Sequence, residues 1–226
     1  MSTVTVKITK DPYGNHYSIF KKPEAELKSG VTILVGCNGY GKTTFIHELE
    51  YWLKCQKIKY IKYDNLTDGG SNSISKILYS NNSNKAIYMA LSSEGENIYE
   101  NFGDVLYNIG ATAAKLERGQ KLFILCDAVD SGLSIDNILE VKDIFDLVVN
   151  NEKKAHGIDV YMIFSANSFE LARGQNCFDI YECKYIAFDD YEEYKKYILS
   201  TKKLKEKRIK RSENIVKKKK DKMKNG

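Results

Sequence analysis

The stretch "GCNGYGKT" at residues 36–43 constrains the fold of this 226-residue chain more than any other feature. It matches the pattern G-x-x-x-x-G-K-[ST] at every fixed position. The apolar run 31–36 precedes it and indicates a strand buried on both faces. The segment 42–54 follows with apolar residues at helical spacing. The sequence therefore predicts a strand, a phosphate-binding loop and a helix in succession.

The composition of this loop suits a nucleotide phosphate. Glycines allow positive φ and leave room for the ligand, and successive backbone N–H groups then form an anion-binding nest beside a helix N-terminus. We expect Lys42 to reach the β- and γ-phosphates and Thr43 to ligate Mg²⁺. A glycine-rich turn that matches by chance is the alternative, but the flanking elements disfavour it. The predicted nucleotide contacts are Gly36, Cys37, Asn38, Gly39, Tyr40, Gly41, Lys42, Thr43 and Thr44.

The remaining pattern predicts an α/β fold. Strands and helices alternate along the chain, which favours a largely parallel sheet between helices. An antiparallel pair of strands at 4–9 and 16–20, around a turn at 11–15, is expected at the N-terminus. Later strands are expected at 57–64, 121–127, 159–166, 178–183 and 184–188, and helices at 94–118, 134–154 and 189–211.

Composition limits the class of protein. Hydrophobic residues make up 42% of the chain, as in ordinary globular domains. No apolar run is long enough to span a bilayer, and the first 20 residues lack the pattern of a secretion signal. The five cysteines show no metal-binding spacing. We therefore expect a cytoplasmic protein with reduced thiols and no membrane insertion.

Charge divides the chain unevenly. Residues 201–226 contain 13 Lys or Arg and 3 Asp or Glu, a balance of +10, so the net +5 leaves −5 for residues 1–200. We expect a domain over 1–200 and a basic, partly disordered tail over 201–226. The tail is either a solvated charge run, a contact for nucleic-acid phosphates, or a contact for anionic lipid or an acidic protein.

The wider motifs resemble the ATP-binding cassette (ABC) superfamily, in a compact soluble form related to the heads of chromosome-maintenance and recombination-repair ATPases. The string "GCNGYGKTTF" resembles its phosphate loop, and "KLFILCD" at 121–127 resembles its Walker B strand. The resemblance implies a P-loop NTPase sandwich in which Asp127 holds Mg²⁺ through water. Residues 131–133 resemble the D-loop that follows, with Ser134 in place of its final aspartate.

A third segment, "LSSEGENIYENF" at 91–102, resembles the ABC signature. Ser93 matches the signature serine and Gly95 its second glycine, while Glu94 replaces the first glycine. Ser93 and Glu96 also fit an ordinary helix capping box, which is compatible with the signature. The resemblance implies that Ser93 and Gly95 contact ATP held by a second protomer, in a homodimer or a heterodimer with a paralogue. The short spacing from the loop implies a reduced helical subdomain.

Two catalytic positions depart from the family. Ala128 occupies the place of the glutamate that polarises the attacking water, and the strand 159–166 is followed by no histidine, with Ser165 and Asn167 in that region. Loss of a general base typically costs about 10²–10⁴ in rate. We predict MgATP binding with slow hydrolysis that depends on Lys42 and Asp127. Asp130, or Glu94 of a partner, is the candidate substitute base.

Three functions remain open from the sequence. The leading one is an ATP-gated dimerisation switch, with nucleic acid as a candidate partner. The others are the ATPase subunit of a transporter and a non-catalytic nucleotide-binding scaffold. The remaining contacts are assigned only as candidates: Tyr13 or Tyr17 for adenine stacking, and Asp64 or Asn65 for the Q-loop, since Gln56 precedes the relevant strand.

Overall fold

The computed structural model describes residues 1–14, 18–64 and 105–224, with side chains described up to residue 217. Several residues singled out above lie outside the described part of the chain and are not discussed structurally. They are Tyr17, Asn65, Ser93, Glu94, Gly95 and Glu96.

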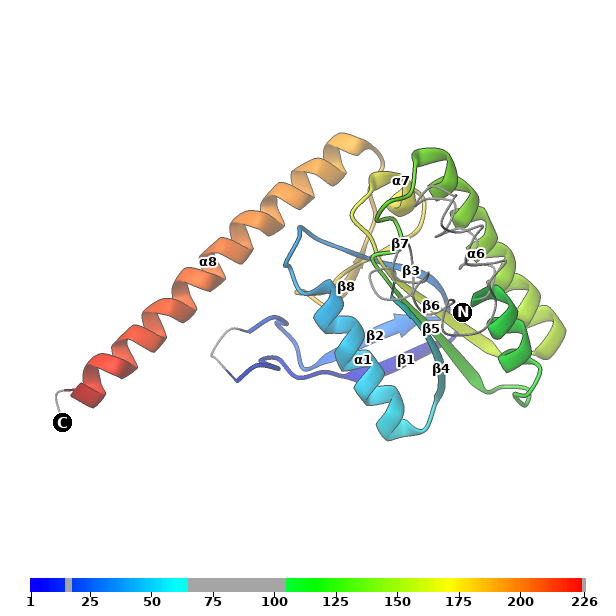
Figure 1. The fold of residues 1–226 in the computed structure, drawn as a ribbon, viewed down its shortest axis with the longest axis horizontal. Coiled ribbons are helices and arrows are strands. Elements are labelled where there is room, and N and C mark those ends of the chain that lie inside the picture. The colour runs from blue at the N-terminus through cyan, green and yellow to red at the C-terminus, as the bar shows by residue number, and fades with distance from the viewer. Residues whose placement is uncertain (15–17, 65–104, 225–226) are drawn as a thin grey trace, which may run out of the picture.

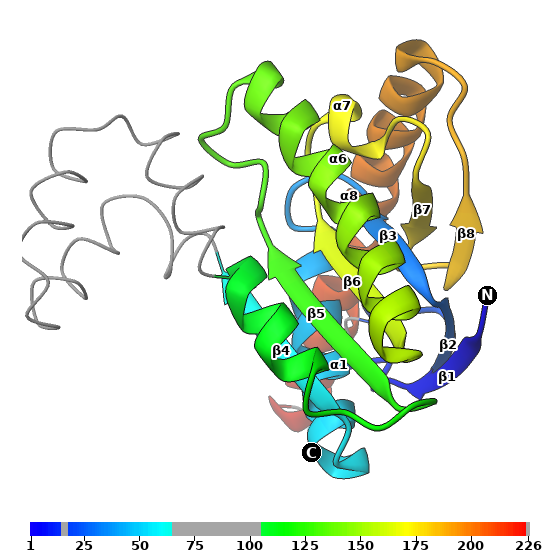
Figure 2. The ribbon, with the colours of Figure 1, turned by 90° about the vertical axis from the view of Figure 1, so that its right-hand side faces the viewer.

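A six-stranded sheet forms the centre of the molecule, in the order β4-β5-β6-β3-β7-β8 (Figures 1 and 2). The first five of these strands run parallel, and β8 pairs with β7 in the antiparallel sense. This confirms the predicted α/β fold with a largely parallel sheet. The strands are β3 (Gly30–Val35), β4 (Lys59–Asp64), β5 (Lys121–Asp127), β6 (Asp159–Ser165), β7 (Asn176–Asp179) and β8 (Lys184–Ile186).

Helices cover both faces of this sheet. On one face lie α6 (Ile135–His156) and a helical segment over 105–113, and on the other lies α1 (Lys42–Gln56) (Figure 2). The short helix α7 (Phe169–Ala172) follows β6. Because β5 is covered on both sides, all residues from Leu122 to Asp127 are buried. This explains why its sequence is continuously apolar rather than alternating.

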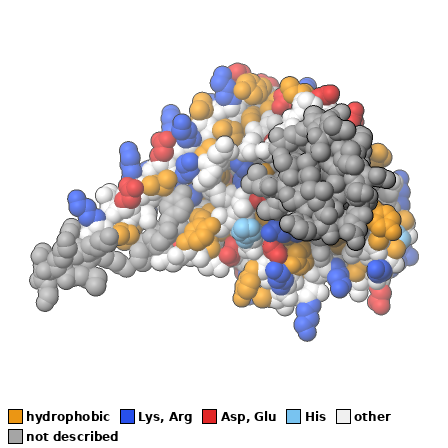
Figure 3. All heavy atoms as spheres, viewed as in Figure 1, with side chains coloured by type: hydrophobic (Ala, Val, Ile, Leu, Met, Phe, Trp, Pro, Cys, Tyr) orange, Lys and Arg blue, Asp and Glu red, His pale blue; other side chains and the backbone are white. Residues whose placement is uncertain are grey.

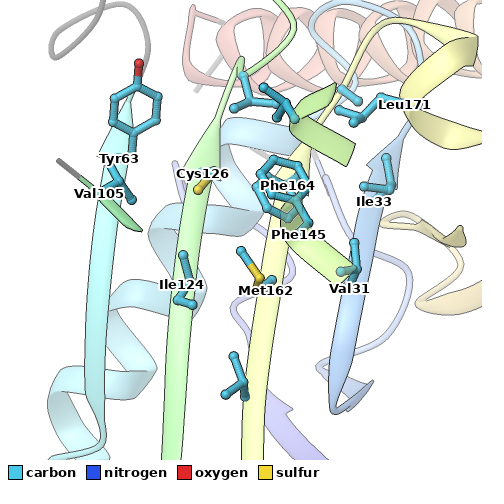
Figure 4. Close-up of a cluster of buried hydrophobic side chains, with 14 of the residues drawn as sticks. Val31, Ile33, Tyr63, Val105, Ile124, Cys126, Phe145, Met162, Phe164 and Leu171 are labelled. Atoms are coloured by element: carbon cyan, nitrogen blue, oxygen red, sulfur yellow. The ribbon is translucent and has the colours of Figure 1, made fainter. Parts of the chain in front are cut away.

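The core divides along the pleat of the sheet. Alternate β5 residues Ile124 and Cys126 face α6, where the ring of Phe145 stacks on Phe164 with centroids 3.9 Å apart (Figure 4). The intervening Phe123 faces the α1 side and stacks on Tyr161 at 4.5 Å. Burying a large apolar side chain contributes about 1.5–3 kcal/mol, so these two layers account for much of the stability of the sheet.

The N-terminal strand pair differs from the prediction in its second member. β1 (Thr3–Lys7) pairs antiparallel with β2 (Glu24–Lys28), and residues 18–20 do not form a strand. The sequence of β2 alternates exposed charge with buried Ala25 and Leu27, as a strand covering one side of the core requires. Ile19 and Phe20 are instead buried beside the α1 side of the core.

The C-terminal helix is longer than the predicted range 189–211. α8 (Tyr191–Lys224) is one continuous helix, and the expected domain boundary at residue 200 falls inside it. No glycine or proline interrupts 191–224, and lysine, glutamate and arginine are good helix formers. The outer half of α8 extends away from the sheet (Figure 1), and exposed Lys and Arg side chains lie along it (Figure 3).

Among the described helices, none combines the length and the apolar character needed to cross a membrane.

Candidate functional site

The glycines of the predicted phosphate loop adopt conformations that other residues rarely take. The φ angles are 144° at Gly36, 68° at Gly39 and 116° at Gly41. A Cβ atom at Gly36 would lie 2.2 Å from Cδ1 of Tyr40, and one at Gly41 would lie 2.5 Å from Cγ2 of Ile19. Both contacts are far below any real Cβ distance, so the turn requires glycine at these two positions.

A cleft of about 350 Å³ opens over this loop. It lies at the carboxyl ends of β3, β5 and β6, which meet at one edge because these neighbouring strands are parallel. Gly36 and Cys37 shape the turn without lining the cleft. The residues that line it are Tyr13, Ile19, Asn38, Gly39, Tyr40, Gly41, Lys42, Thr43, Thr44, Asp127, Ala128, Ser165 and Asn167.

The first turn of α1 supplies a positive end to this cleft. Gly41 is the N-cap residue, no side chain makes a capping hydrogen bond, and no acidic residue lies in the first turn. The first N–H groups of a helix have no partners within the helix, and the helix dipole adds partial positive charge there. Residues Lys42, Thr43 and Thr44 therefore present an anion-binding terminus to the cleft.

Lys42 is buried, with 8% of its surface exposed, and is held from two sides. Its Nζ donates to the carbonyl of Gly36 at 2.6 Å and to Oδ1 of Asn167 at 3.0 Å. Burial lowers the pKa of Lys42, while the nearby Asp130, Cys37 and Asp127 act in the opposite direction. The lysine is thus positioned between the loop and the end of β6 before any ligand arrives.

Asp127 ends β5 next to the loop. Its Oδ1 accepts a hydrogen bond from Oγ of Ser165, and this Ser165 Oγ in turn accepts from the backbone N–H of Ala128 at 2.8 Å. Asp127 and Thr43 both line the cleft. A carboxylate and a hydroxyl are ligands that Mg²⁺ accepts, with phosphate oxygens and water completing an octahedron. The residues present therefore fit a magnesium nucleotide.

Within the described ranges, no group of three or more His, Cys, Asp and Glu side chains is arranged to hold a metal ion.

Asp130, the candidate substitute base, is bonded to the turn that follows β6. Its Oδ2 accepts from the backbone N–H groups of Asn167 and Ser168, both at 2.6 Å, and it is not among the residues lining the cleft. Its Oδ1 is buried and makes no hydrogen bond within the described structure. Asp130 thus holds the turn after β6, which in turn positions the Asn167 amide against Lys42.

Ser165 and Asn167 are site residues that the sequence analysis noted only as replacements for a histidine. Both line the cleft and bond to Asp127 and Lys42 respectively. The sequence could have indicated both residues, because they lie at the carboxyl end of a predicted buried strand. Parallel sheets of α/β proteins bind their ligands at that end. What the sequence did not show is that β6 lies between β3 and β5.

The candidates for adenine stacking and for the Q-loop differ in their position relative to the cleft. Tyr13 lines the cleft, and its hydroxyl lies 3.2 Å from Oγ1 of Thr44. Asp64 ends β4 and pairs in register with Asp127, so it lies on the same edge of the sheet. Gln56 ends α1, a helix that begins at the loop, and so lies far from the cleft.

One group of residues near the loop was missed altogether. Thr201 and Lys205 of α8, which the sequence analysis placed in the basic tail, bond directly to the backbone of Cys37 and Asn38. No local pattern indicates contacts across more than 160 residues of chain.

A family model described as an AAA domain matches residues 15–225, nearly the whole chain. The comparison with curated proteins gave no match to the chain. The matched range includes the phosphate loop, α1, the strand ending in Asp127 and all of α8. The chain therefore belongs to this AAA domain family, and it is a P-loop ATPase domain with the nucleotide-binding fold of that class.

Proposed function

We propose that this protein binds MgATP in the loop cleft and acts as an ABC-type, ATP-gated dimerisation switch with slow hydrolysis. One observation carries the proposal: the fold brings Lys42, Thr43 and Asp127 to a single cleft at the carboxyl ends of β3 and β5. Family membership supports nucleotide binding, and the ABC-like motifs of the sequence support the finer assignment.

Different residues of the cleft are proposed to bind the phosphates, the cation and the adenine. Lys42 and the amides of residues 38–44 would hold the β- and γ-phosphates, and Thr43 and Asp127 would hold Mg²⁺, which would supply positive charge to offset that of the phosphates. Tyr13 lies beside Thr44 at the mouth of the cleft, where 63% of its surface is exposed, and it is our candidate for stacking on the adenine.

Slow hydrolysis is supported by Ala128. This residue lines the cleft directly after Asp127, with a φ of 52°, and presents only a methyl group. A methyl group neither orients a water molecule nor accepts its proton. Asp130 remains the candidate substitute base, but it would first have to release the two N–H groups that its Oδ2 now accepts.

Dimerisation and nucleic-acid binding extend the proposal. Ser93 and Gly95 are the proposed contacts to ATP on a second protomer, in a homodimer or a heterodimer with a paralogue. The exposed lysines and arginines along α8 (Figure 3) suit the phosphates of nucleic acid rather than its bases. Cytoplasmic location is retained as part of this proposal.

The test uses the purified full-length chain. Binding of ATP is measured by calorimetry with and without Mg²⁺, mass by light scattering, and turnover with and without double-stranded DNA. We expect saturable Mg²⁺-dependent binding, a doubled mass with MgATP, and turnover far below about 1 s⁻¹. Absence of saturable binding overturns the nucleotide proposal, an unchanged mass overturns the switch, and ordinary turnover overturns slow hydrolysis.

A non-catalytic nucleotide-binding scaffold is the second candidate, because Ala128 leaves the cleft without the usual base. Single-turnover measurements separate it from the switch. The scaffold predicts no detectable ADP over hours, whereas the switch predicts complete conversion of one bound ATP per site.

A further inference from the structure

One face of α8 lies against the phosphate loop. Oγ1 of Thr201 accepts a hydrogen bond from the backbone N–H of Cys37 at 3.1 Å, and Thr201 is only 2% exposed. One turn further along, Nζ of Lys205 donates to the carbonyl oxygen of Asn38 at 2.8 Å. Two successive residues of the loop are therefore held by two residues of the C-terminal helix.

A third contact lies a further turn along. The guanidinium carbon of Arg208 lies 5.4 Å from the ring centroid of Tyr40 and 4.7 Å from that of Tyr181. The Tyr40 ring fills the space beside Gly36 that a Cβ atom would need. Arg208 thus packs on the side chain that supports the first glycine of the loop.

The spacing of these residues makes the contact a continuous one. Positions 205 and 208 lie four and seven residues after position 201, so the three side chains share one face of the helix. Tyr194, seven residues before Thr201, lies on the same face, and its hydroxyl donates to the carbonyl of Asn167 at 2.9 Å. The helix accordingly contacts both the loop and the opposite wall of the cleft.

Peptide geometry gives this contact a consequence for phosphate binding. In a planar trans peptide the C=O and the following N–H point in opposite directions. Lys205 is not among the residues lining the cleft, so it draws the Asn38 carbonyl away from the ligand space. The N–H of Gly39 is thereby directed towards the cleft, where a phosphate-binding loop needs its amides.

We propose that Thr201, Lys205 and Arg208 are positioning residues of the nucleotide site, which hold the loop amides in the phosphate-binding orientation. The first half of α8 is then part of the site rather than of a tail. This inference rests on the proposed function for its affinity readout, and on the loop contacts alone for a second readout that needs no nucleotide.

The test compares two variants that remove different kinds of contact in the full-length chain. Lys205→Met keeps the length of the side chain and removes its charge. Thr201→Val keeps the shape and removes the hydroxyl, which accepts from the N–H of Cys37 and donates within α8 to the carbonyl of Ile198. Lys207→Met is the matched control, since Lys207 is exposed two positions along the same helix and loses the same charge. Lys205→Arg and Thr201→Ser are the conservative rescues.

We expect each of the two variants to weaken MgATP binding roughly 10-fold, since hydrogen bonds that involve a charge or a buried amide are worth about that factor. The control and the rescues should stay within about 2-fold of wild type. Loss only in Lys205→Met, with Thr201→Val unchanged, would mean long-range charge attraction and would overturn loop positioning.

Amide hydrogen exchange of the ligand-free chain supplies the second readout. Both variants should exchange faster than wild type in the peptide covering residues 36–41, with no change in β5 or α6. Unchanged exchange in that peptide overturns the inference even if wild type binds no nucleotide. Absence of nucleotide binding by wild type, with faster loop exchange in the variants, overturns the proposed function and leaves the positioning role supported.

Discussion

The two halves of the cleft are built differently. The half formed by residues 36–44 comes from one continuous stretch, with glycines, a buried lysine and a helix terminus all suited to phosphate. The half at the ends of β5 and β6 offers Asp127 for a cation, but its other groups are committed to each other or inert. Under the proposed function, phosphate binding and water activation would therefore depend on different strands of the sheet.

The two halves of the cleft also differ in the partners of their charged groups. Lys42 is buried in the loop half and donates across the cleft to Asn167 in the other. Asp130 faces the backbone of 167 and 168, and Ala128 presents a methyl group. The second half therefore contacts the first through the bond from Lys42 to Asn167, and Asp130 holds the turn that carries this asparagine.

The strongest way to break this comparison is to restore the missing carboxylate. Ala128→Glu should raise the rate of ATP hydrolysis by about 10²–10⁴, because a general base typically contributes that factor. Single-turnover kinetics at saturating MgATP measure it. Ala128→Gln is the matched control, with equal size and no basic carboxylate, and should leave the rate near wild type. Equal rates in the two variants would show that position 128 does not face the attacking water.

Removal of the buried lysine tests the loop half. Lys42→Met should weaken MgATP binding about 100-fold, since charge-assisted bonds to phosphate are worth up to about 3 kcal/mol. Lys154→Met serves as control, because Lys154 is exposed in the last turn of α6 and lies outside the cleft. Titration calorimetry gives both constants. Retained affinity in Lys42→Met would place the phosphates elsewhere than over this loop.

The backbone of the loop gives a smaller effect that sharpens the same point. Gly36→Ala sets a Cβ atom against Tyr40 at positive φ and should lower Tm by roughly 6–12 °C, or about 3 kcal/mol. Gly39→Ala meets nothing closer than Nζ of Lys205 at 3.5 Å and should lower Tm by only about 2–4 °C. Thermal unfolding of ligand-free protein measures both, and equal losses would contradict the tight packing at Gly36.

An ion-pair cluster on α1, the helix that follows the phosphate loop, should lose its stabilising effect in acid. Glu50 of α1 bonds to Nζ of Lys54 at 2.8 Å and of Lys62 at 3.1 Å, linking the helix to β4. Burial alone would raise its pKa, but the bonds from the two lysines lower it to about 2 from an ordinary 4.5. Its contribution to stability is therefore complete above pH 4.5 and is lost as the pH falls towards 2.

Glu50→Gln should accordingly lower the free energy of unfolding by about 1 kcal/mol at pH 7, with the difference from wild type shrinking below pH 4.5. Denaturant unfolding across this range measures the effect. Glu140→Gln is the control, because Glu140 is exposed on α6. A difference that does not change with pH would assign the loss to packing rather than to charge.

The comparison also explains which predictions succeeded. The α/β fold was predictable because β3, β5 and β6 are continuous apolar runs joined by helical patterns, and each signal lies within its own segment. The position of the second N-terminal strand was not predictable, because 16–20 and 24–28 are both short. Only the packing of the core decides which of the two pairs with β1. Ile19 and Phe20 were needed as core residues instead.

By itself, the sequence determined the phosphate loop, because glycine conformation, the lysine and the helix start are local properties of nine adjacent residues. Only the tertiary structure decided the surroundings of that loop. The order of strands brings Asn167 to Lys42, and the docking of α8 brings Lys205 to Asn38. These pairs are 125 and 167 residues apart, and their contact arises from parallel strand order and helix packing rather than from any local pattern.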